Sequence, residues 1–423
     1  MVKVFVILSG IGDKPCALLG GETPLEAAET QNLDYISSNG NSGYIYALNA
    51  QVSPKSDESL MALLGYDPHQ HYTGGGPLAA YGSGFNYKDG WLALKTNFST
   101  IENKKIIERR AGRSLTTKEA VELAEDINKK LKFEVPFIFM PTVGHEGFLV
   151  FRENLSANIS NMDPAYRKVG KFGVTFSPDV NIVQKCRALD PDQKTKLAAR
   201  LVNEFAVKSH KILECHEVNE KRKKKYLLPA NVVIPRDAGN SLPNLEKKKN
   251  WAAVISTANS VAISKLAGMN VLNNFYRKAE STDIFENVYD SLDRQISDAK
   301  TALKNKTFEN LFVYFNQADI CGMENRPGEK KKVIEIIDKK FINFLLDIAG
   351  VEIVAAGDHS TPCEMKARTS NPVPVVHYGK GKSDEVQRFT EKECINGGYR
   401  KIIGKDLLNV VGFTANKMHV NVV

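Results

Sequence analysis

Short apolar runs recur along the chain, and each ends in glycine or polar residues. Residues 2–8 form the first run, and the sequence Ser9-Gly10-Ile11-Gly12-Asp13 follows it directly. Such a run, rich in β-branched side chains, predicts a buried strand followed by a tight loop. Runs at 43–49, 311–315, 351–356 and 373–376 predict further strands.

Helices are predicted between several of these strands. Apolar residues recur every three or four positions in 190–213 and 330–348, which is the spacing of an amphipathic helix. A threonine followed by proline at the start of 23–28 favours a helix start there. Shorter helices are predicted at 59–66 and 384–394. The alternation of strands and helices predicts an α/β fold, with a mostly parallel sheet flanked by helices.

The middle of the chain interrupts this alternation. Apolar runs at 133–140 and 147–152 flank the sequence Gly144-His145-Glu146-Gly147, a pattern typical of a β-hairpin. We therefore expect one sheet domain that is interrupted by a second domain. The expected division is a discontinuous core at 1–105 and 250–423, with an inserted α+β cap domain at 106–249.

Composition excludes several classes of protein. The 423 residues carry a formal net charge of +8, a mild excess that does not call for a nucleic-acid partner. No apolar run approaches the roughly 20 residues that span a bilayer, so we expect no membrane partner. The six cysteines form no Cys-x-x-Cys pair, and the N-terminus does not resemble a signal peptide. These features favour reduced thiols in the cytoplasm or another reducing intracellular compartment.

Two short basic runs lie in or beside the expected insertion, at 221–225 and 247–249. Lysine runs of this kind are usually solvated surface. The alternative is contact with an acidic partner surface, such as a second subunit or a cytoskeletal filament. Charge alone does not decide between the two.

Polar residues follow three of the predicted strands. They are the sequences 9–13, 317–319 and Asp358-His359-Ser360. In an open α/β sheet, chemistry takes place at the carboxyl ends of the strands. A carboxylate next to an imidazole suits a divalent metal ion, although a capping Asp and a hydrogen-bonded His would give the same pattern.

Several motifs resemble the archaeal-type, cofactor-independent phosphoglycerate mutases of the alkaline phosphatase superfamily. They lie in the same order over nearly the whole chain. They are Gly10-Ile11-Gly12-Asp13, 20–28, Ser56-Asp57, 64–68, Gly76-Pro77-Leu78, 109–113, Pro229-Ala230-Asn231, 358–363 and Pro372-Val373-Pro374. The resemblance implies an alkaline phosphatase-like core with an inserted cap that closes over the site.

The resemblance also implies a reaction. In this family a serine takes the phosphoryl group of a phosphoglycerate and returns it to the other hydroxyl. Two divalent metals, usually manganese, activate the serine, and arginines hold the phosphate and carboxylate. The position of the nucleophile falls on Ser56.

The implied metal ligands are only partly present. Asp319, Asp358 and His359 occupy ligand positions of the family. The other ligand positions carry Ser9, Met323 and Arg368. A thioether and a guanidinium are poor or repulsive partners for manganese, so we expect the second metal site to be lost. His145 or His377 could replace a ligand only with a changed geometry.

The implied substrate side is also altered. The family pattern Gly-Arg-Gly-Pro-Leu-Glu reads Gly74-Gly75-Gly76-Pro77-Leu78-Ala79, which lacks an arginine and a glutamate. Retained candidates for substrate binding are Arg109, Arg110, Arg113 and Lys366, and Asn231 is also kept. These cations suggest a pocket for phosphoglycerate or another phosphate ester.

Two hypotheses about function follow. The first is a mutase-like protein that has lost catalysis, needs no metal cofactor and serves as a structural or interaction subunit of an assembly with other proteins. The alternative is an active 2,3-bisphosphoglycerate-independent phosphoglycerate mutase that uses two Mn²⁺ or Mg²⁺ ions in glycolysis. The replaced ligands favour the first hypothesis, and the retained Ser56 favours the second.

Overall fold

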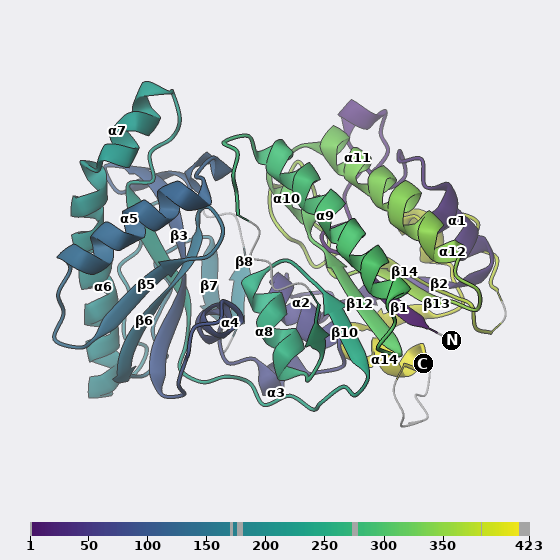
Figure 1. Ribbon diagram of the computed structural model, residues 1–423, viewed down its shortest axis with the longest axis horizontal. Helices are drawn as coiled ribbons and strands as arrows, with labels where there is room; N and C mark the ends of the chain where they lie inside the picture. Colours follow the sequence, from purple (N-terminus) through teal and green to yellow (C-terminus); the bar gives the residue numbers. More distant parts are fainter. Residues whose placement is uncertain (1, 170–171, 176–180, 273–277, 382, 414–423) are drawn as a thin grey trace.

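The computed structural model describes residues 2–169, 172–175, 181–272, 278–381 and 383–413. Its larger sheet has eight strands, shown with their helices in Figure 1. Their order is β11 (Asn270–Val271), β10 (Trp251–Val254), β12 (Asn310–Phe315), β1 (Lys3–Leu8), β13 (Glu352–Gly357), β14 (Val373–Tyr378), β2 (Gly40–Tyr46) and β15 (Arg400–Ile403). Only β14 runs antiparallel to its neighbours in this described sheet. The expected α/β class with a mostly parallel sheet is confirmed.

The register places three strand ends side by side. Strand β1 lies between β12 and β13, and Leu8 pairs with Phe315 on one side and Gly357 on the other. Both neighbours are parallel to β1, so all three strands end at the same edge of the sheet. The polar residues that follow each strand therefore meet at this edge.

Helices cover both faces of the larger sheet. Val4 and Val6 point into a core formed with α1 (Gln31–Ser38), α9 (Ile284–Lys304), α11 (Pro327–Ile337) and α12 (Asn343–Leu346). Phe5 and Ile7 point to the opposite face, toward α2 (Ser56–Leu63), α8 (Ala258–Leu266) and α14 (Leu407–Val410). This alternation explains why the strand reads as one continuous apolar run, because both of its faces are buried.

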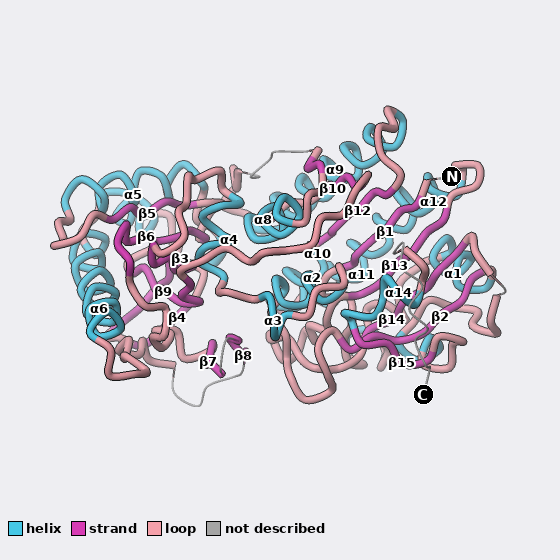
Figure 2. The backbone as a smooth tube through the Cα atoms, turned by 90° about the horizontal axis from the view of Figure 1, so that it is seen from below, coloured by secondary structure: helices cyan, strands magenta, loops and turns pink. Residues whose placement is uncertain are grey.

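A second sheet of five antiparallel strands forms the rest of the molecule. The strands are β4 (Lys105–Glu108), β3 (Trp91–Glu102), β6 (Glu146–Asn154), β5 (Phe137–Pro141) and β9 (Val232–Gly239), which pairs with β3. Helices α5 (Thr117–Lys130) and α6 (Gln193–Glu214) pack on this sheet, and α7 (Glu217–Lys224) follows them. Figure 2 shows the two sheets toward opposite ends of the molecule. The part that carries the second sheet is called the cap below, and the part that carries the larger sheet is called the core.

Smaller elements complete the fold. Helix α4 (Gly75–Gly82) packs its alanines against Phe148 and Val150 of the cap. Other short elements are α3 (Pro68–His71), α10 (Gln317–Met323), α13 (Glu391–Cys394), the strand pair β7 (Tyr166–Val169) and β8 (Phe172–Thr175), and 3-10 helices at Ala17–Leu19, Ala111–Arg113 and Gly404–Asp406. The predicted hairpin is confirmed, because β5 and β6 pair antiparallel.

Several boundaries differ from the sequence-based expectations. The cap sheet already begins at Trp91, within the range expected for the core, because β3 pairs with β6 and β9. Residues 23–28 form a turn rather than a helix, although Thr23 and Glu26 make the reciprocal hydrogen bonds of a helix start. Of the helix expected at 384–394, only Glu391–Cys394 is helical. The helix expected at 330–348 contains a π-helical segment at Asp338–Ile342.

Every helix in the described ranges is too short or too polar to span the apolar layer of a membrane.

Candidate functional site

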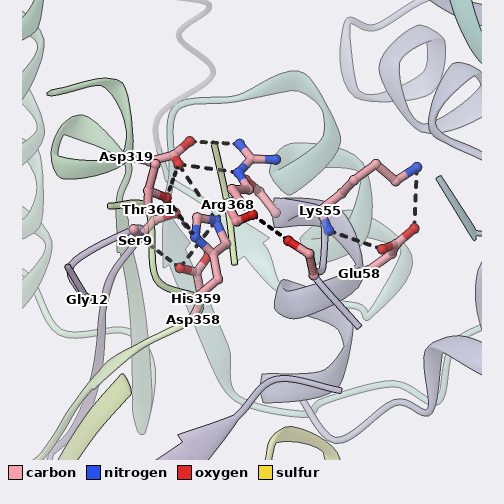
Figure 3. Close-up of polar contacts among 12 residues, drawn as sticks. Ser9, Gly12, Lys55, Glu58, Asp319, Asp358, His359, Thr361 and Arg368 are labelled. Carbon is pink, nitrogen blue, oxygen red and sulfur yellow. Dashed lines mark hydrogen bonds and ion pairs between the residues drawn. The ribbon is translucent and has the colours of Figure 1, made fainter. Parts of the chain in front are cut away.

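The ends of β1, β12 and β13 bring together four side chains that the sequence analysis singled out. They are Ser9, Asp319, Asp358 and His359 (Figure 3). Tyr314, Thr361 and Arg368 join them through hydrogen bonds. These seven residues are called the Asp319 cluster below.

Asp358 is fully buried, and its carboxylate is held by donors from the protein itself. The hydroxyl of Ser9 donates to Oδ2 at 2.9 Å, and the hydroxyl of Tyr314 donates to the same atom at 2.7 Å. The backbone N–H of Gly10 donates to Oδ1 at 3.0 Å. Burial and the nearby Asp358 charge raise the pKa of Tyr314 well above its usual value, so this phenol keeps its proton. Tyr314 escaped the sequence analysis because it lies within an apolar strand.

Asp319 is held by a guanidinium. Arg368 donates from Nε to Oδ1 at 3.3 Å and from Nη2 to Oδ2 at 2.7 Å, and Thr361 donates to Oδ1 at 2.7 Å (Figure 3). Burial alone would raise the pKa of Asp319, but Arg368 and the neighbouring donors hold it far below its usual range. The carboxylate is therefore ionised and already paired with a cation.

The donor set of the Asp319 cluster does not fit a pair of divalent ions. Both carboxylates already accept hydrogen bonds from protein groups. The Arg368 guanidinium repels a cation at Asp319. Within the described ranges, no three His, Cys, Asp or Glu side chains are arranged to hold a metal ion.

Ser56 lies beside this cluster, at the first residue of α2. Its Oγ is 3.4 Å from Nε2 of His359. The hydroxyl of Thr361 donates its hydrogen bond to Asp319. Its oxygen therefore accepts a hydrogen bond from the protonated Nδ1 of His359, with 3.1 Å between the two atoms. Burial lowers the pKa of His359 despite the nearby carboxylates, which keeps the ring neutral. The unprotonated Nε2 therefore faces the hydroxyl of Ser56.

A cleft between core and cap opens onto Ser56. The cavity has a volume of about 250 Å³. Cationic side chains that line it are Lys55, Lys95, Arg110, Arg113, Arg236, Lys278 and Arg368. The acidic residues that line it are Asp57, Glu146, Asp237, Asp290 and Asp319, of which Asp237 is paired with Lys55 and Asp319 with Arg368. Lys95 and Arg236 were missed from the sequence because single cations in strands carry no motif.

The four predicted substrate-binding residues divide between two cavities. Arg113 lines the Ser56 cavity, whereas Arg109 and Lys366 line a neighbouring cavity of about 480 Å³. Arg110 lines both. Arg109 is engaged by Asp163, at 3.0 Å, and by Asn181. The structure therefore places Arg110 and Arg113, but not Arg109 and Lys366, in the lining of the cavity that contains Ser56.

The histidines considered as replacement ligands have different surroundings. His377 bonds to Glu352 and Tyr399, at 2.9 and 2.8 Å, and does not line the cleft. His145 lines the cleft, where burial and the charges of Arg113 and Arg110 hold its pKa well below its usual value. Asn231 bonds to the backbone of Ile101 inside the cap. Neither His377 nor Asn231 lies at the Asp319 cluster.

The two basic runs are only partly free surface. Lys221 and Lys223 pair with glutamates of their own helix. Lys248 lies over the rings of Tyr66 and Trp251, and burial lowers its pKa to about 8. The run at 247–249 is therefore not a continuous basic patch.

Comparisons with known proteins agree with this architecture. A family model described as 2,3-bisphosphoglycerate-independent phosphoglycerate mutase matches residues 37–219. The mutase of that name from Thermococcus kodakarensis is 32% identical over 415 residues, which cover 96% of each chain. The one from Pyrococcus furiosus is 33% identical over 418 residues, again with 96% of each chain covered.

Solved structures resemble the whole chain as well. The PH0037 protein of Pyrococcus horikoshii matches with a TM-score of 0.72 and 25% identity, over 98% of both chains. The cofactor-independent phosphoglycerate mutase of Thermoplasma acidophilum matches with a TM-score of 0.55 and 26% identity, over 98% of this chain and 100% of that one. The chain belongs to the family of 2,3-bisphosphoglycerate-independent phosphoglycerate mutases.

Proposed function

We propose that this protein binds phosphoglycerate, or a closely similar phosphorylated hydroxy acid, in the Ser56 cleft without divalent metal ions. The observation that carries the proposal is the pairing of Arg368 with Asp319. This ion pair neutralises a carboxylate that would otherwise be available as a metal ligand. The relatives named as phosphoglycerate mutases support the choice of ligand.

The charges of the cleft support anion binding. The contacts of Arg368 with Asp319 use Nε and Nη2, and the residue also lines the cavity. These contacts do not use Nη1, and a guanidinium carries five donors, so we expect Nη1 to donate to a phosphate oxygen. Arg110 is only loosely paired, 3.9 Å from Glu108 and 3.8 Å from Glu324, and adds a second phosphate donor.

Phosphoryl transfer by the two-metal route is not part of this proposal. Metals that neutralise the phosphoryl group and activate the serine supply much of the rate of such reactions. Removal of a single electrostatic group of this kind typically costs about 10² to 10³ in rate. We therefore expect no measurable two-metal mutase turnover, and no bound manganese at the Asp319 cluster.

A second candidate is an active phosphoglycerate mutase. Two observations favour it: family membership over nearly the whole chain, and the position of the Ser56 hydroxyl against the unprotonated Nε2 of His359. A neutral imidazole in contact with a hydroxyl is the usual arrangement of a general base with its nucleophile.

One pair of experiments separates the candidates. Calorimetric titration with 3-phosphoglycerate in EDTA should show binding. We expect Arg110→Met to weaken it about tenfold or more, since a charge-assisted donor is lost. Arg152→Met is the matched control, because Arg152 lies over Phe85 and Trp91 and outside the cavity. An absence of binding to the wild type contradicts the proposal.

Conversion of 3- to 2-phosphoglycerate is then measured with saturating manganese, for the wild type and Ser56→Ala. The proposal expects no conversion by either protein. Activity that Ser56→Ala abolishes would establish the second candidate instead.

Other expectations from the sequence stay predictions. They are the role as a structural or interaction subunit, protein partners, the reducing intracellular or cytoskeletal location, and the exclusion of nucleic-acid and membrane partners.

A further inference from the structure

A second buried cluster of charges lies on the other side of Ser56. It consists of Lys55, Asp57, Glu58, Tyr72, Asp237 and Asn259, and is called the Lys55 cluster below. Lys55 and Asp57 are the immediate chain neighbours of Ser56, and both are buried. Neither is needed for the anion binding proposed above.

Lys55 is held from both ends. Its backbone N–H donates to Oε2 of Glu58 at 3.1 Å, and its ammonium lies 3.3 Å from Oε1 of the same residue (Figure 3). The ammonium also donates to the hydroxyl of Tyr72 at 2.8 Å and to Oδ1 of Asp237 at 2.9 Å. A buried ammonium with its donors used in this way is locked in one rotamer.

Asp57 is held in the same manner. Its Oδ2 accepts from the Tyr72 hydroxyl at 3.1 Å and from the Asn259 amide at 2.8 Å. Tyr72 therefore connects the residue before Ser56 with the residue after it. The backbone of Ser56 is fixed between two anchored neighbours, and its hydroxyl points to His359.

Asp237 is the member of this cluster that comes from the cap. It lies on β9, whereas the other members come from the core side of the cleft. Its φ angle is +55°, in the left-handed region, near a register shift between β3 and β9. A non-glycine residue keeps this conformation only where its surroundings hold it, as contacts with Lys55 and Arg236 do here.

We propose that Lys55 is a positioning residue that couples the docking of the cap to the placement of Ser56. The Lys55–Asp237 ion pair joins core to cap directly beside the serine. Loss of the pair frees both the first turn of α2 and the bulged segment of β9. A purely structural ion pair would instead loosen only the domain in which it is altered.

Hydrogen exchange of the full chain tests this coupling without any ligand. In Asp237→Asn, a cap variant of nearly unchanged shape, we expect amides of residues 54–63 in the core to exchange about tenfold faster. Lys55→Met should in turn speed exchange in residues 232–239 of the cap. Asp237→Asn replaces one carboxylate oxygen by an amide NH2 group of similar size. The test can therefore still be made with this variant if Lys55→Met does not fold.

The matched control is Arg222→Met. Arg222 is also buried and paired, with Glu119 at 2.9 Å, but both residues lie inside the cap. We expect this variant to destabilise the cap and leave exchange at 54–63 unchanged. The proposal would be overturned if Arg222→Met accelerated amide exchange at residues 54–63 as much as Asp237→Asn does, or if Asp237→Asn did not accelerate it.

A second measurement, of ligand affinity, rests on the proposed function. The affinity for 3-phosphoglycerate should fall about tenfold in Asp237→Asn, because Ser56 and the cap cations lose their relative placement. A wild type that does not bind 3-phosphoglycerate overturns the proposed function, and the exchange data still decide the role of Lys55.

Discussion

The two buried charge clusters that meet at Ser56 differ in what they connect. The Asp319 cluster lies at the edge of one sheet, and its carboxylates are satisfied by side chains of the core. The Lys55 cluster joins core to cap through one ion pair. Buried carboxylates of the same chemical type are thus neutralised within the core in one cluster and across the contact between core and cap in the other. The difference lies in the domain of the carboxylate, because Arg368 and Lys55 both belong to the core, whereas Asp319 belongs to the core and Asp237 to the cap.

The largest expected effect is on the Asp319 cluster, from Arg368→Met. The substitution leaves Asp319 buried without its cation. We expect the free energy of unfolding to fall by about 3–5 kcal/mol. Urea denaturation measures it, and Arg294→Met, which removes an exposed ion pair, is the control with no measurable change expected. A loss no greater than that of the control would mean that Asp319 needs no partner.

The second prediction sharpens the contrast by rebuilding the implied metal site. Met323→His combined with Arg368→His gives Asp319 two imidazole neighbours and removes the repelling guanidinium. We expect manganese affinity to rise about 100-fold over the wild type, or about 2.7 kcal/mol. Electron paramagnetic resonance of Mn²⁺ at pH 8 detects it, since imidazole ligands must be neutral. Wild-type protein that binds manganese equally tightly would refute the loss of this site.

The third prediction concerns the stability of the protein at low pH. The pKa of Asp319 lies far below its unfolded value, so its stabilising effect is fully present above about pH 5 and is lost as the pH falls. We expect it to account for about 1 kcal/mol of the stability lost between pH 5 and pH 3. Urea midpoints across this range measure the loss. In Arg368→Met this loss of stability between pH 5 and pH 3 should disappear. If the variant loses as much stability over this range as the wild type, the ion pair is not the cause.

The smallest effect is expected far from both clusters, at Lys221. Its partner Glu217 is four residues away on the same exposed helix. Exposed pairs of this geometry contribute little to stability, so Lys221→Ala should leave the urea midpoint within experimental scatter. A clear shift would show that α7 makes a contact beyond those described.

Much of the core could be predicted because its signals are local. Apolar runs predicted β1, β12 and β13, and the polar residues after them predicted where Asp319, Asp358 and His359 would meet. Turns that depend on distant contacts were missed. Residues 23–28 carry the hydrogen bonds of a helix start, yet the chain turns there, with Leu25 buried in the core.

The sequence by itself determined the fold class and the family, because strand periodicity and motif residues are properties of the chain. The tertiary structure alone decided which groups neutralise which charges. Tyr314 looks like a strand residue until its hydroxyl meets Asp358, and Asp237 lies 182 residues from Lys55 in the chain. Ion pairs and hydrogen bonds form only where folding brings donors within about 3 Å of acceptors, and spacing along the chain does not encode that distance.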